Sequence, residues 1–292
     1  MTASVVTGDL VPIDAQTATL GSDDHGPEER PARPVAVAAF RIERHPVTNA
    51  QFAAFVRDTG YRTVAEQPLD PADFPGAPVE NLQPGSLVFT PTPGPVDLRH
   101  LSQWWTWTPG ACWRRPEGRR SSLADRADHP VVHVAHADAE AYAAWAGLAL
   151  PTEAEWETAA RGGLAGAAFT WGDSPEGVGE RLANYWHGDF PWRADPGYGR
   201  TSPVGTFPPN PYGLVDMAGN VWEWTADPYT DAGDRCGVPD GGSVPRRVVK
   251  GGSFLCADSY CRRYRPAARR GQPVDTGMSH IGFRCVDRAA GP

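Results

Sequence analysis

Lysine is almost absent from this sequence. The 27 basic residues include only one lysine, Lys250, and the formal net charge at pH 7 is −8. Proteins that bind nucleic acid need clusters of basic side chains to neutralise phosphates. No lysine-rich tract of that kind is present, so the composition argues against nucleic acid as a partner. An acidic surface can steer a basic ligand toward the protein, but it does not identify that ligand.

The sequence also lacks a long hydrophobic run. A membrane-spanning helix needs about 18 to 20 consecutive apolar residues, and no segment approaches that length. The start, M-T-A-S-V-V-T-G-D-L, carries no charged segment followed by an apolar one, as a secretory signal would. We therefore expect a soluble, cytoplasmic protein with no membrane partner.

Cysteine is scarce and odd in number. An odd count leaves at least one thiol free or paired outside the chain, which argues against a disulfide framework. Few cysteines in a long chain are typical of a reducing compartment such as the cytoplasm. The five are Cys112, Cys236, Cys256, Cys261 and Cys285.

Glycine, proline and tryptophan are plentiful instead, with 32, 30 and 11 residues, and they are scattered along the whole chain. This composition predicts many turns and long ordered loops that large aromatic side chains hold in place. No repeat and no linker divides the chain. We predict one α+β domain of low regular secondary structure over residues 35–287, preceded by a polar segment over residues 1–34.

Capping patterns and hydrophobic periodicity predict three helices and a few strands. Two helices begin with a capping box, and all three end at a glycine. The predicted helices cover residues 48–60, 137–147 and 151–162, and the predicted strands cover residues 35–42, 221–224, 247–250 and 281–286. Residues 66–128 show neither the helical nor the strand periodicity of apolar residues, so we expect a long ordered loop region there.

The segment with the clearest chemical content is G-G-S-F-L-C-A-D-S-Y-C-R-R-Y-R-P-A-A-R, residues 251–269, in which Cys256 and Cys261 are five positions apart. On a helix such residues point about 140° apart, so the thiols converge only in a loop, which the two leading glycines permit. A converging pair has three interpretations: inert buried thiols, a reversible disulfide, or a soft-metal site for Cu(I) or zinc. The flanking arginines would favour thiolates and support the last two equally.

Further short motifs occur in order along the chain: H-P-V-T-N (45–49), D-H-P-V-V-H-V (128–134), L-P-T-E-A-E-W-E (150–157), A-A-R-G-G (159–163), G-N-V-W-E-W (219–224), K-G-G-S (250–253) and G-F-R-C (282–285). They resemble the formylglycine-generating enzyme family. Most are shared with sulfoxide synthases and non-catalytic relatives, so they indicate the fold rather than the chemistry. The specific motif is S-x-x-C-x-x-x-Y-C followed by R-Y-R, at residues 253–265.

The resemblance implies a C-type-lectin-like variant fold with long ordered loops. It also implies an activity, the oxidation by O2 and a thiol reductant of a cysteine in a Cys-x-Pro-x-Arg segment of an unfolded sulfatase polypeptide to Cα-formylglycine. By the same resemblance Cys256 and Cys261 bind Cu(I) and the substrate thiolate joins them. Ser253, Trp222 and Tyr260 then line an oxygen pocket, whose aromatic rings would exclude water.

The resemblance further implies two structural calcium sites, and oxygen-only ligation suits Ca²⁺. The first set consists of Asp216, Gly219, Val221 and Glu223, whose acids could instead be exposed residues at a strand end. The second set consists of Asn184, Tyr185, Asp195 and Tyr198, where Pro196 stands in place of the expected acid.

Several positions depart from the family pattern. Ala144 and Ala160 replace cysteines that pair in secretory members, which leaves Cys285 as an inert buried thiol. A run of three histidines has metal-like spacing, but we expect hydrogen-bonded rings rather than a metal site. These histidines are His129, His133 and His136.

The family substrate needs an aromatic surface for its proline and an acid for its guanidinium. We expect the surface from Trp104, Trp105 and Trp113. We expect the acid from Asp70 or Asp73, because Gly85 and Ser86 stand where the family has its acid.

Two other functions share the fold. An iron-dependent sulfoxide synthase resembles this domain fused to a helical bundle that supplies iron-binding histidines, and we expect no such set before residue 35. A non-catalytic, lectin-like binding protein has no need of a special cysteine pair. The thiols therefore discriminate between these alternatives, and a separation above about 8 Å would exclude both a disulfide and a shared metal.

Overall fold

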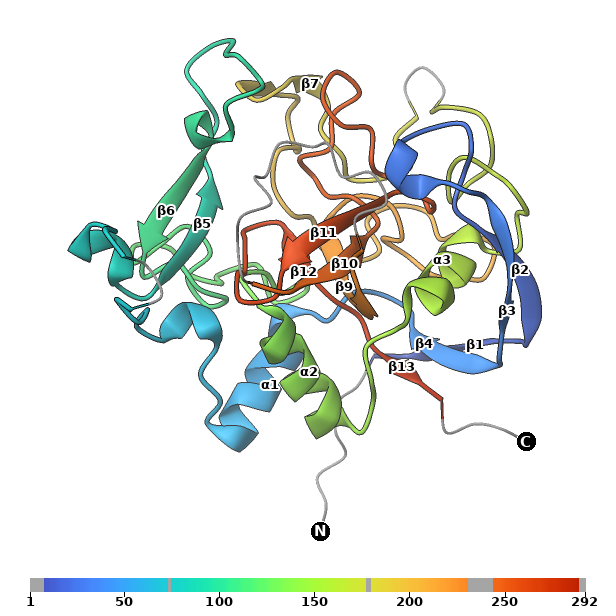
Figure 1. The fold of residues 1–292 in the computed structure, drawn as a ribbon, viewed down its shortest axis with the longest axis horizontal. Coiled ribbons are helices and arrows are strands. Elements are labelled where there is room, and N and C mark those ends of the chain that lie inside the picture. The colour runs from blue at the N-terminus through green and yellow to red at the C-terminus, as the bar shows by residue number, and fades with distance from the viewer. Residues whose placement is uncertain (1–7, 73–74, 177–179, 231–243, 289–292) are drawn as a thin grey trace.

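The computed structural model describes residues 8–72, 75–176, 180–230 and 244–288 (Figure 1). The helices are α1 Asn49–Thr59, α2 His136–Ala146 and α3 Glu153–Arg161, with short 3-10 helices at η1 Pro27–Glu29, η2 Val64–Glu66, η3 Val79–Leu82 and η4 Leu101–Gln103. Among these residues no helix combines the length and apolar character needed to cross a bilayer.

The strands are short and far apart in the sequence. They are β1 Leu10–Ile13, β2 Gln16–Leu20, β3 Arg33–Val37, β4 Phe40–Glu43, β5 Gly85–Phe89, β6 Trp105–Pro109, β7 Gly188–Asp189, β8 Arg193–Ala194, β9 Trp222–Pro228, β10 Arg246–Lys250, β11 Arg269–Pro273, β12 Ile281–Gly282 and β13 Val286–Asp287. Long irregular segments join them, in agreement with the content of glycine, proline and tryptophan.

The three predicted helices are confirmed, and local sequence explains their ends. At α1 the Thr48 hydroxyl accepts a hydrogen bond from the Gln51 amide, and the Gln51 side chain accepts one from the Thr48 amide. Thr152 and Glu155 make the same capping box at α3. Each helix ends at a glycine with positive φ, for example +70° at Gly60, where a side chain would be strained.

Several strand predictions need correction. The strand expected over residues 35–42 is two strands, β3 and β4, and the one expected over 281–286 divides into β12 and β13. The region 66–128 holds a hairpin, β5–β6, in which Leu87 lies opposite Trp107. The W-T-W-T alternation of β6 is typical of a strand, but the many prolines and glycines around it favoured the prediction of an irregular loop.

The main sheet has the order β11-β10-β9-β12, with β12 parallel to β9, and β11 forms one of its edges. A second sheet has the order β1-β4-β13, and β2 pairs with β3. The segment before residue 35 therefore contributes two strands to the domain instead of standing apart from it. In Figure 1 α1 and α2 lie side by side, with the β5–β6 hairpin and the β2–β3 ribbon on opposite sides of the molecule.

The core combines aromatic packing with buried ion pairs. The largest cluster includes Phe52, Tyr142 and Phe283, and the Phe52 and Tyr142 rings are stacked with centroids 5.9 Å apart. The single lysine, Lys250, is fully buried and donates to the Glu157 carboxylate at 2.9 Å. This ion pair joins β10 to α3 beneath the sheet.

Two buried carboxyls predict how stability depends on pH. Burial raises the pKa of Glu43 from about 4.5 to about 7 and that of Asp138 to about 6. Between about pH 4.5 and 7 these two carboxyls bind more protons in the folded chain than in the unfolded chain, so their contribution to the free energy of unfolding falls as pH rises. Buried histidines act in the opposite direction, because burial lowers the pKa of His133 to about 4 and that of His280 well below its ordinary value. The contribution of Glu43 is therefore measured by comparing wild type with Glu43→Gln. We expect the free energy of unfolding of the variant to gain relative to wild type as pH rises from about 4.5 to about 7, and an unchanged slope in the variant would contradict the assignment to Glu43.

Candidate functional site

The segment after β10 folds into a tight loop that brings the two thiols together. The amides of Cys261 and Arg262 both donate to the Ala257 carbonyl, at 3.0 and 3.1 Å, and Arg262 has a φ of +44°. At Gly252 a Cβ would lie 2.6 Å from the Arg263 carbonyl oxygen, so only glycine permits this close return of the chain. The segment is therefore a loop and not a helix, as the expected convergence of the two thiols requires.

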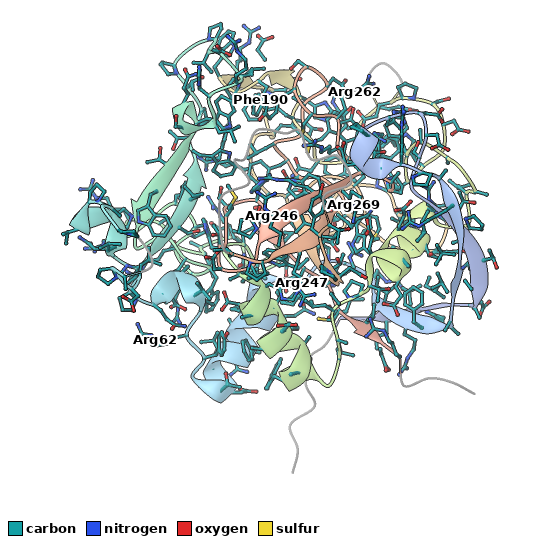
Figure 2. All side chains as sticks on the ribbon, viewed as in Figure 1. Arg62, Phe190, Arg246, Arg247, Arg262 and Arg269 are labelled. Carbon is teal, nitrogen blue, oxygen red and sulfur yellow. The ribbon has the colours of Figure 1, made fainter. Side chains whose placement is uncertain are left out.

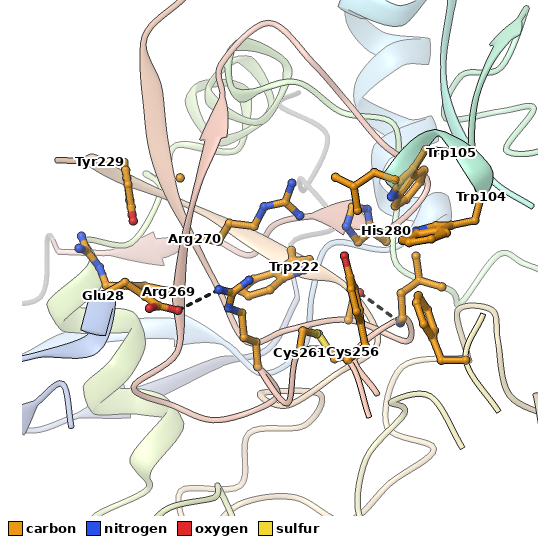
Figure 3. A pocket seen from close by; sticks show the side chains of 17 residues that line it. Glu28, Trp104, Trp105, Trp222, Tyr229, Cys256, Cys261, Arg269, Arg270 and His280 are labelled. Carbon is orange, nitrogen blue, oxygen red and sulfur yellow. Dashed lines mark hydrogen bonds and ion pairs between the residues drawn. The ribbon is translucent and has the colours of Figure 1, made fainter. Parts of the chain in front are cut away.

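The side chains of Cys256 and Cys261 lie next to each other (Figure 3), and a side-chain hydrogen bond between them shifts the pKa of both thiols. The hydrogen bond from Cys256 lowers the pKa of the Cys261 thiol to about 7, whereas burial raises the pKa of Cys256 well above its ordinary value. Cys261 is therefore the more acidic thiol of the pair. Both thiols are free, and Cys261 is partly exposed, so the pair is accessible to a ligand.

A cavity of about 90 Å³ lies over the thiols. The three residues that the resemblance placed there, Ser253, Trp222 and Tyr260, all line it. Ser253 and Trp222 are buried, whereas Tyr260 is 36% exposed and stacks on Phe190 with ring centroids 4.8 Å apart. Trp222 comes from β9 and the other two from the thiol loop, so the main sheet and its following loop build the site together.

The cavity also has charged walls, of which the sequence had indicated only Arg263. Glu28, Arg263, Arg269 and Arg270 line it. Figure 2 labels Arg269 on β11 and Arg246 and Arg247 on the neighbouring strand β10, and the register places Arg269 opposite Lys250. No local signal marks Glu28, because it reaches the cavity only through the packing of η1 against β11.

Two ion pairs hold η1 against the thiol loop. Arg263 donates to the Glu28 carboxylate at 2.9 Å. Arg265 makes two hydrogen bonds to Glu29, and both of these side chains are almost fully buried. The R-Y-R part of the specific motif thus fixes the loop through the N-terminal segment, in a bidentate geometry that only arginine offers.

His280 is a second missed residue. It lines the cavity and lies 4.7 Å from Trp105 between ring centroids. Its Nδ1 atom is buried and has no hydrogen-bond partner among the described residues. Burial holds the pKa of His280 well below its ordinary value, so the ring is neutral.

The expected substrate surface is partly wrong. Trp104 and Trp105 line the cavity, but Trp113 is buried in the main core, 5.2 Å from Phe52 between ring centroids. Asp70 is exposed, accepts a hydrogen bond from Ala72 and does not line the cavity. Asp73 lies outside the described residues. Ser86, at the position of the family's acid, is buried and donates to the Gly277 carbonyl.

The histidine run is hydrogen bonded, as expected. His129 bonds to Thr201, His133 to Ser86 and the Pro116 carbonyl, and His136 to the Thr225 carbonyl. No group of three or more metal-ligating acids, histidines or cysteines occurs in the part of the chain that the structure describes. Cys285 is a buried free thiol, and burial raises its pKa.

The first calcium set lies within a network of protein contacts. Both oxygens of Glu223 accept hydrogen bonds from Arg284, at 2.7 and 2.8 Å, and one also accepts from Trp156. Asp216 accepts from the Gly205 amide and Asn220. Both acids are buried rather than exposed. A cation there would compete with Arg284 for Glu223, so these contacts do not favour calcium.

The second calcium set contains one oxygen suited to a cation. Asn184 Oδ1 is buried without a hydrogen-bond partner among the described residues, while its amide donates to the Arg200 carbonyl at 2.9 Å. Asp195 lies 3.7 Å from Arg181, with its side chain about half exposed. Tyr185 is buried, and the Tyr198 amide donates to the Asp195 carbonyl.

The fold and the site together define an α+β protein of low regular content with paired thiols under an aromatic pocket. Residues 3–289 match the sulfatase-modifying factor enzyme 1-like domain, and the chain belongs to that family. It is 55% identical to the formylglycine-generating enzyme of Mycobacterium tuberculosis, over 95% of this chain and 97% of the relative. It is 45% identical to the enzyme of the same name from Thermomonospora curvata, over 95% and 92%. The solved structure of PvdO from Pseudomonas aeruginosa is similar, with a TM-score of 0.64, 26% identity and coverage of 96% and 94%. The predicted fold class is thereby confirmed.

Proposed function

We propose that this chain oxidises a cysteine of a sulfatase polypeptide to Cα-formylglycine in the cavity above Cys256 and Cys261. The observation that carries the proposal is the contact between these two thiols at the base of an aromatic, surface-accessible cavity. A lectin-like binding protein has no use for such a pair. The chain's identity to formylglycine-generating enzymes over nearly its full length supports the same activity.

The reaction needs an oxidant and a reductant, because the carbon of the substrate thiol becomes an aldehyde. One O2, two protons and two electrons convert the cysteine side chain to an aldehyde, hydrogen sulfide and water. The C–S bond and one C–H bond break, and a C=O bond forms. We assign the two electrons to an external thiol, which is oxidised to a disulfide.

We further propose Cu(I) as the cofactor, held by Cys256 and Cys261. The fit rests on the donor set, since two adjacent soft sulfurs with one easily lost proton suit Cu(I). When bound, the metal would supply the one-electron chemistry that O2 requires. A substrate thiolate that enters the cavity meets these sulfurs directly.

The surrounding residues control what reaches the thiols. Trp222 and Trp104 are buried walls, and they keep bulk water from the reacting carbon. Tyr260, Phe190 and Leu101 form an apolar rim, which suits the proline ring of a Cys-x-Pro-x-Arg segment. Among the described residues Glu28 is the only carboxylate that lines the cavity, so we place the substrate guanidinium there, beside its existing partner Arg263, in preference to Asp70.

The test is to incubate the protein with O2, a thiol reductant, Cu(I) and a peptide that contains Cys-x-Pro-x-Arg, and to measure the product mass. We expect loss of the sulfur atom and a product that reacts with an aldehyde probe. The matched controls are the Cys→Ser peptide and an oxygen-free reaction, both of which should give no product. Unchanged cysteine peptide under the complete conditions would contradict the proposal.

Calcium binding remains a prediction, and its test is thermal stability. A cation that binds only the folded chain raises the melting temperature. We expect Ca²⁺ added to chelator-treated protein to raise it, and Asn184→Ala to reduce that gain if the second set is used. Glu223→Gln separates the two sets, since it should affect the gain only if the first set binds. No change on adding Ca²⁺ would contradict both sites.

The cytoplasmic location also remains a prediction. The free thiols Cys112, Cys256, Cys261 and Cys285 agree with a reducing compartment.

A further inference from the structure

Two stacked tyrosines lie beside the thiol loop. The rings of Tyr185 and Tyr264 are nearly parallel, with an interplanar angle of 13° and centroids 4.0 Å apart, and both side chains are buried. Tyr264 is the third residue after Cys261 and belongs to the hydrophobic cluster against which Cys261 packs. The Trp186 amide donates to the Cys256 carbonyl at 3.0 Å, so the segment that carries Tyr185 is hydrogen bonded to the thiol loop. The tyrosine pair is therefore connected to both thiols by short stretches of the chain.

Each phenol of this pair donates a hydrogen bond to a carboxylate. Tyr185 donates to Glu176 at 2.9 Å, and Tyr264 donates to Asp258. A phenol loses an electron much more readily when a neighbouring base accepts its proton in the same step, because a cationic phenol is then avoided. A carboxylate in a direct, charge-assisted hydrogen bond is such a base. The pair is therefore suited to one-electron oxidation and reduction.

Further aromatic rings continue the stack from Tyr264 toward the surface. Phe169 stacks on Tyr264 with centroids 6.0 Å apart, and Trp171 stacks on Phe169 at 4.9 Å. Trp171 is partly exposed. Together with Tyr185 these rings line a second cavity of about 390 Å³, which we call the rear cavity. The thiol loop contributes residues to both cavities, and among the described residues none lines both, so the loop lies between them.

The proposed reaction needs a way for electrons to reach the thiols while the substrate is bound. The cavity over Cys256 and Cys261 measures about 90 Å³, and a polypeptide whose cysteine has reached these sulfurs fills it. An external thiol is then excluded from the reacting sulfur atoms, although each turnover consumes two electrons from it. The substrate does not fill the rear cavity in that state, because the rear cavity lies on the other side of the thiol loop.

We propose that Tyr264 and Tyr185 carry electrons, one at a time, from a thiol reductant in the rear cavity to the O2-derived oxidant at the paired thiols. This inference rests on the proposed function, because that reaction requires two electrons in each turnover. It gives the tyrosines a redox role that needs no contact between the reductant and the substrate.

The electrons and protons of this relay balance. When Tyr264 gives an electron to the oxidant, its O–H bond breaks and the proton moves to Asp258. Tyr185 and then the reductant replace the electron, and the proton returns to the phenol. Over two such steps two thiols lose two electrons and two protons, and one S–S bond forms between their sulfur atoms. The conversion of O2 and the substrate cysteine consumes these two electrons and two protons.

The first test detects the oxidised relay directly. Aminotyrosine, which is oxidised more easily than tyrosine, replaces Tyr264, Tyr185 or, as the control, Tyr142, one position at a time. Tyr142 is also buried and stacked on an aromatic ring, but its hydroxyl has no hydrogen-bond partner among the described residues. The protein with bound Cu(I) and peptide is mixed with O2 without reductant and freeze-quenched. We expect the EPR signal of an aminotyrosyl radical in the Tyr264 and Tyr185 replacements and none in the Tyr142 replacement.

The second test removes only the hydroxyl groups. Tyr264→Phe and Tyr185→Phe keep the stacked rings and the Tyr185 carbonyl, so the fold and the expected calcium ligand are retained. We expect each variant to lower kcat at saturating reductant at least about tenfold and to leave KM for the peptide within about twofold of wild type. Tyr142→Phe is the control and should leave both constants within about twofold of wild type.

Aldehyde formation by wild type with no radical in the Tyr264 and Tyr185 replacements, or with unchanged kcat in both Phe variants, would overturn the relay and leave the proposed function standing. A radical of equal strength in the Tyr142 replacement would also overturn the relay, because the oxidation would then be unspecific. Failure of the proposed function is a different result. Wild type would then form no aldehyde, and the relay, which serves that reaction, would fall with it.

Discussion

Cys256→Ala and Cys261→Ala are each expected to lower the rate of peptide oxidation by at least about a thousandfold, since the two sulfurs act as one unit and either loss removes it. The measurement is initial aldehyde formation at saturating peptide and fixed copper. No sulfur-bearing residue other than these two lines the cavity among the described residues, so no neighbouring sulfur can substitute. Cys112→Ala is the matched control, because Cys112 is a buried free thiol that does not line this cavity.

The control variant should retain a rate within about twofold of wild type once the folded fraction is equal, because it removes only a small buried hydrophobe. Circular dichroism would establish that all three variants are folded. If Cys261→Ala kept more than about a tenth of the wild-type rate, the proposed role of the pair would be wrong.

Arg284→Met should lower the free energy of unfolding by about 3–5 kcal/mol, because it leaves Glu223 as an unpaired buried carboxylate. Arg284 is fully buried and makes two hydrogen bonds to Glu223. It also donates to main-chain carbonyls of two separate segments, including those of Glu43 and Val215. The Arg284 side chain therefore links the C-terminal region to the end of β4 at Glu43 and to the segment before β9. Urea denaturation at pH 7 would measure the expected decrease in the free energy of unfolding.

The matched control for this prediction is Arg288→Met. Arg288 also binds a glutamate, Glu155, with hydrogen bonds of 2.7 and 2.6 Å. Its side chain is 41% exposed, so the pair is screened and its removal should cost about 1 kcal/mol or less. Equal losses in the two variants would contradict the view that burial, rather than pairing alone, determines the effect.

The sequence was sufficient to predict those features that depend on contacts between residues close together in the chain. The capping boxes at Thr48 and Thr152 fixed the helix starts, and glycine fixed their ends, because each signal involves residues within one turn. The thiol loop was predictable for the same reason. The angle between i and i+5 excluded a helix, and the family motif supplied the lining of Ser253, Trp222 and Tyr260.

What the sequence could not predict depends on contacts between distant segments. Glu28 reaches the cavity because it pairs with Arg263, which lies more than two hundred positions away. The strand β11 has the sequence R-R-G-Q-P, which has no β-branched or aromatic residue, and only its pairing with β10 makes it a strand. The same limit applies to Trp113, whose place in the core rather than in the cavity is decided by its contact with Phe52.

The role of the thiol pair is tested most directly by the stoichiometry of Cu(I) binding, measured by competition with a coloured Cu(I) chelator under reducing, oxygen-free conditions. We expect one tightly bound Cu(I) per wild-type chain and per Cys112→Ala chain. We expect no tight binding in Cys256→Ala or in Cys261→Ala, because a single thiolate lacks the second soft ligand. Undiminished Cu(I) binding in both of these variants would contradict the assignment of the metal to this pair of thiols.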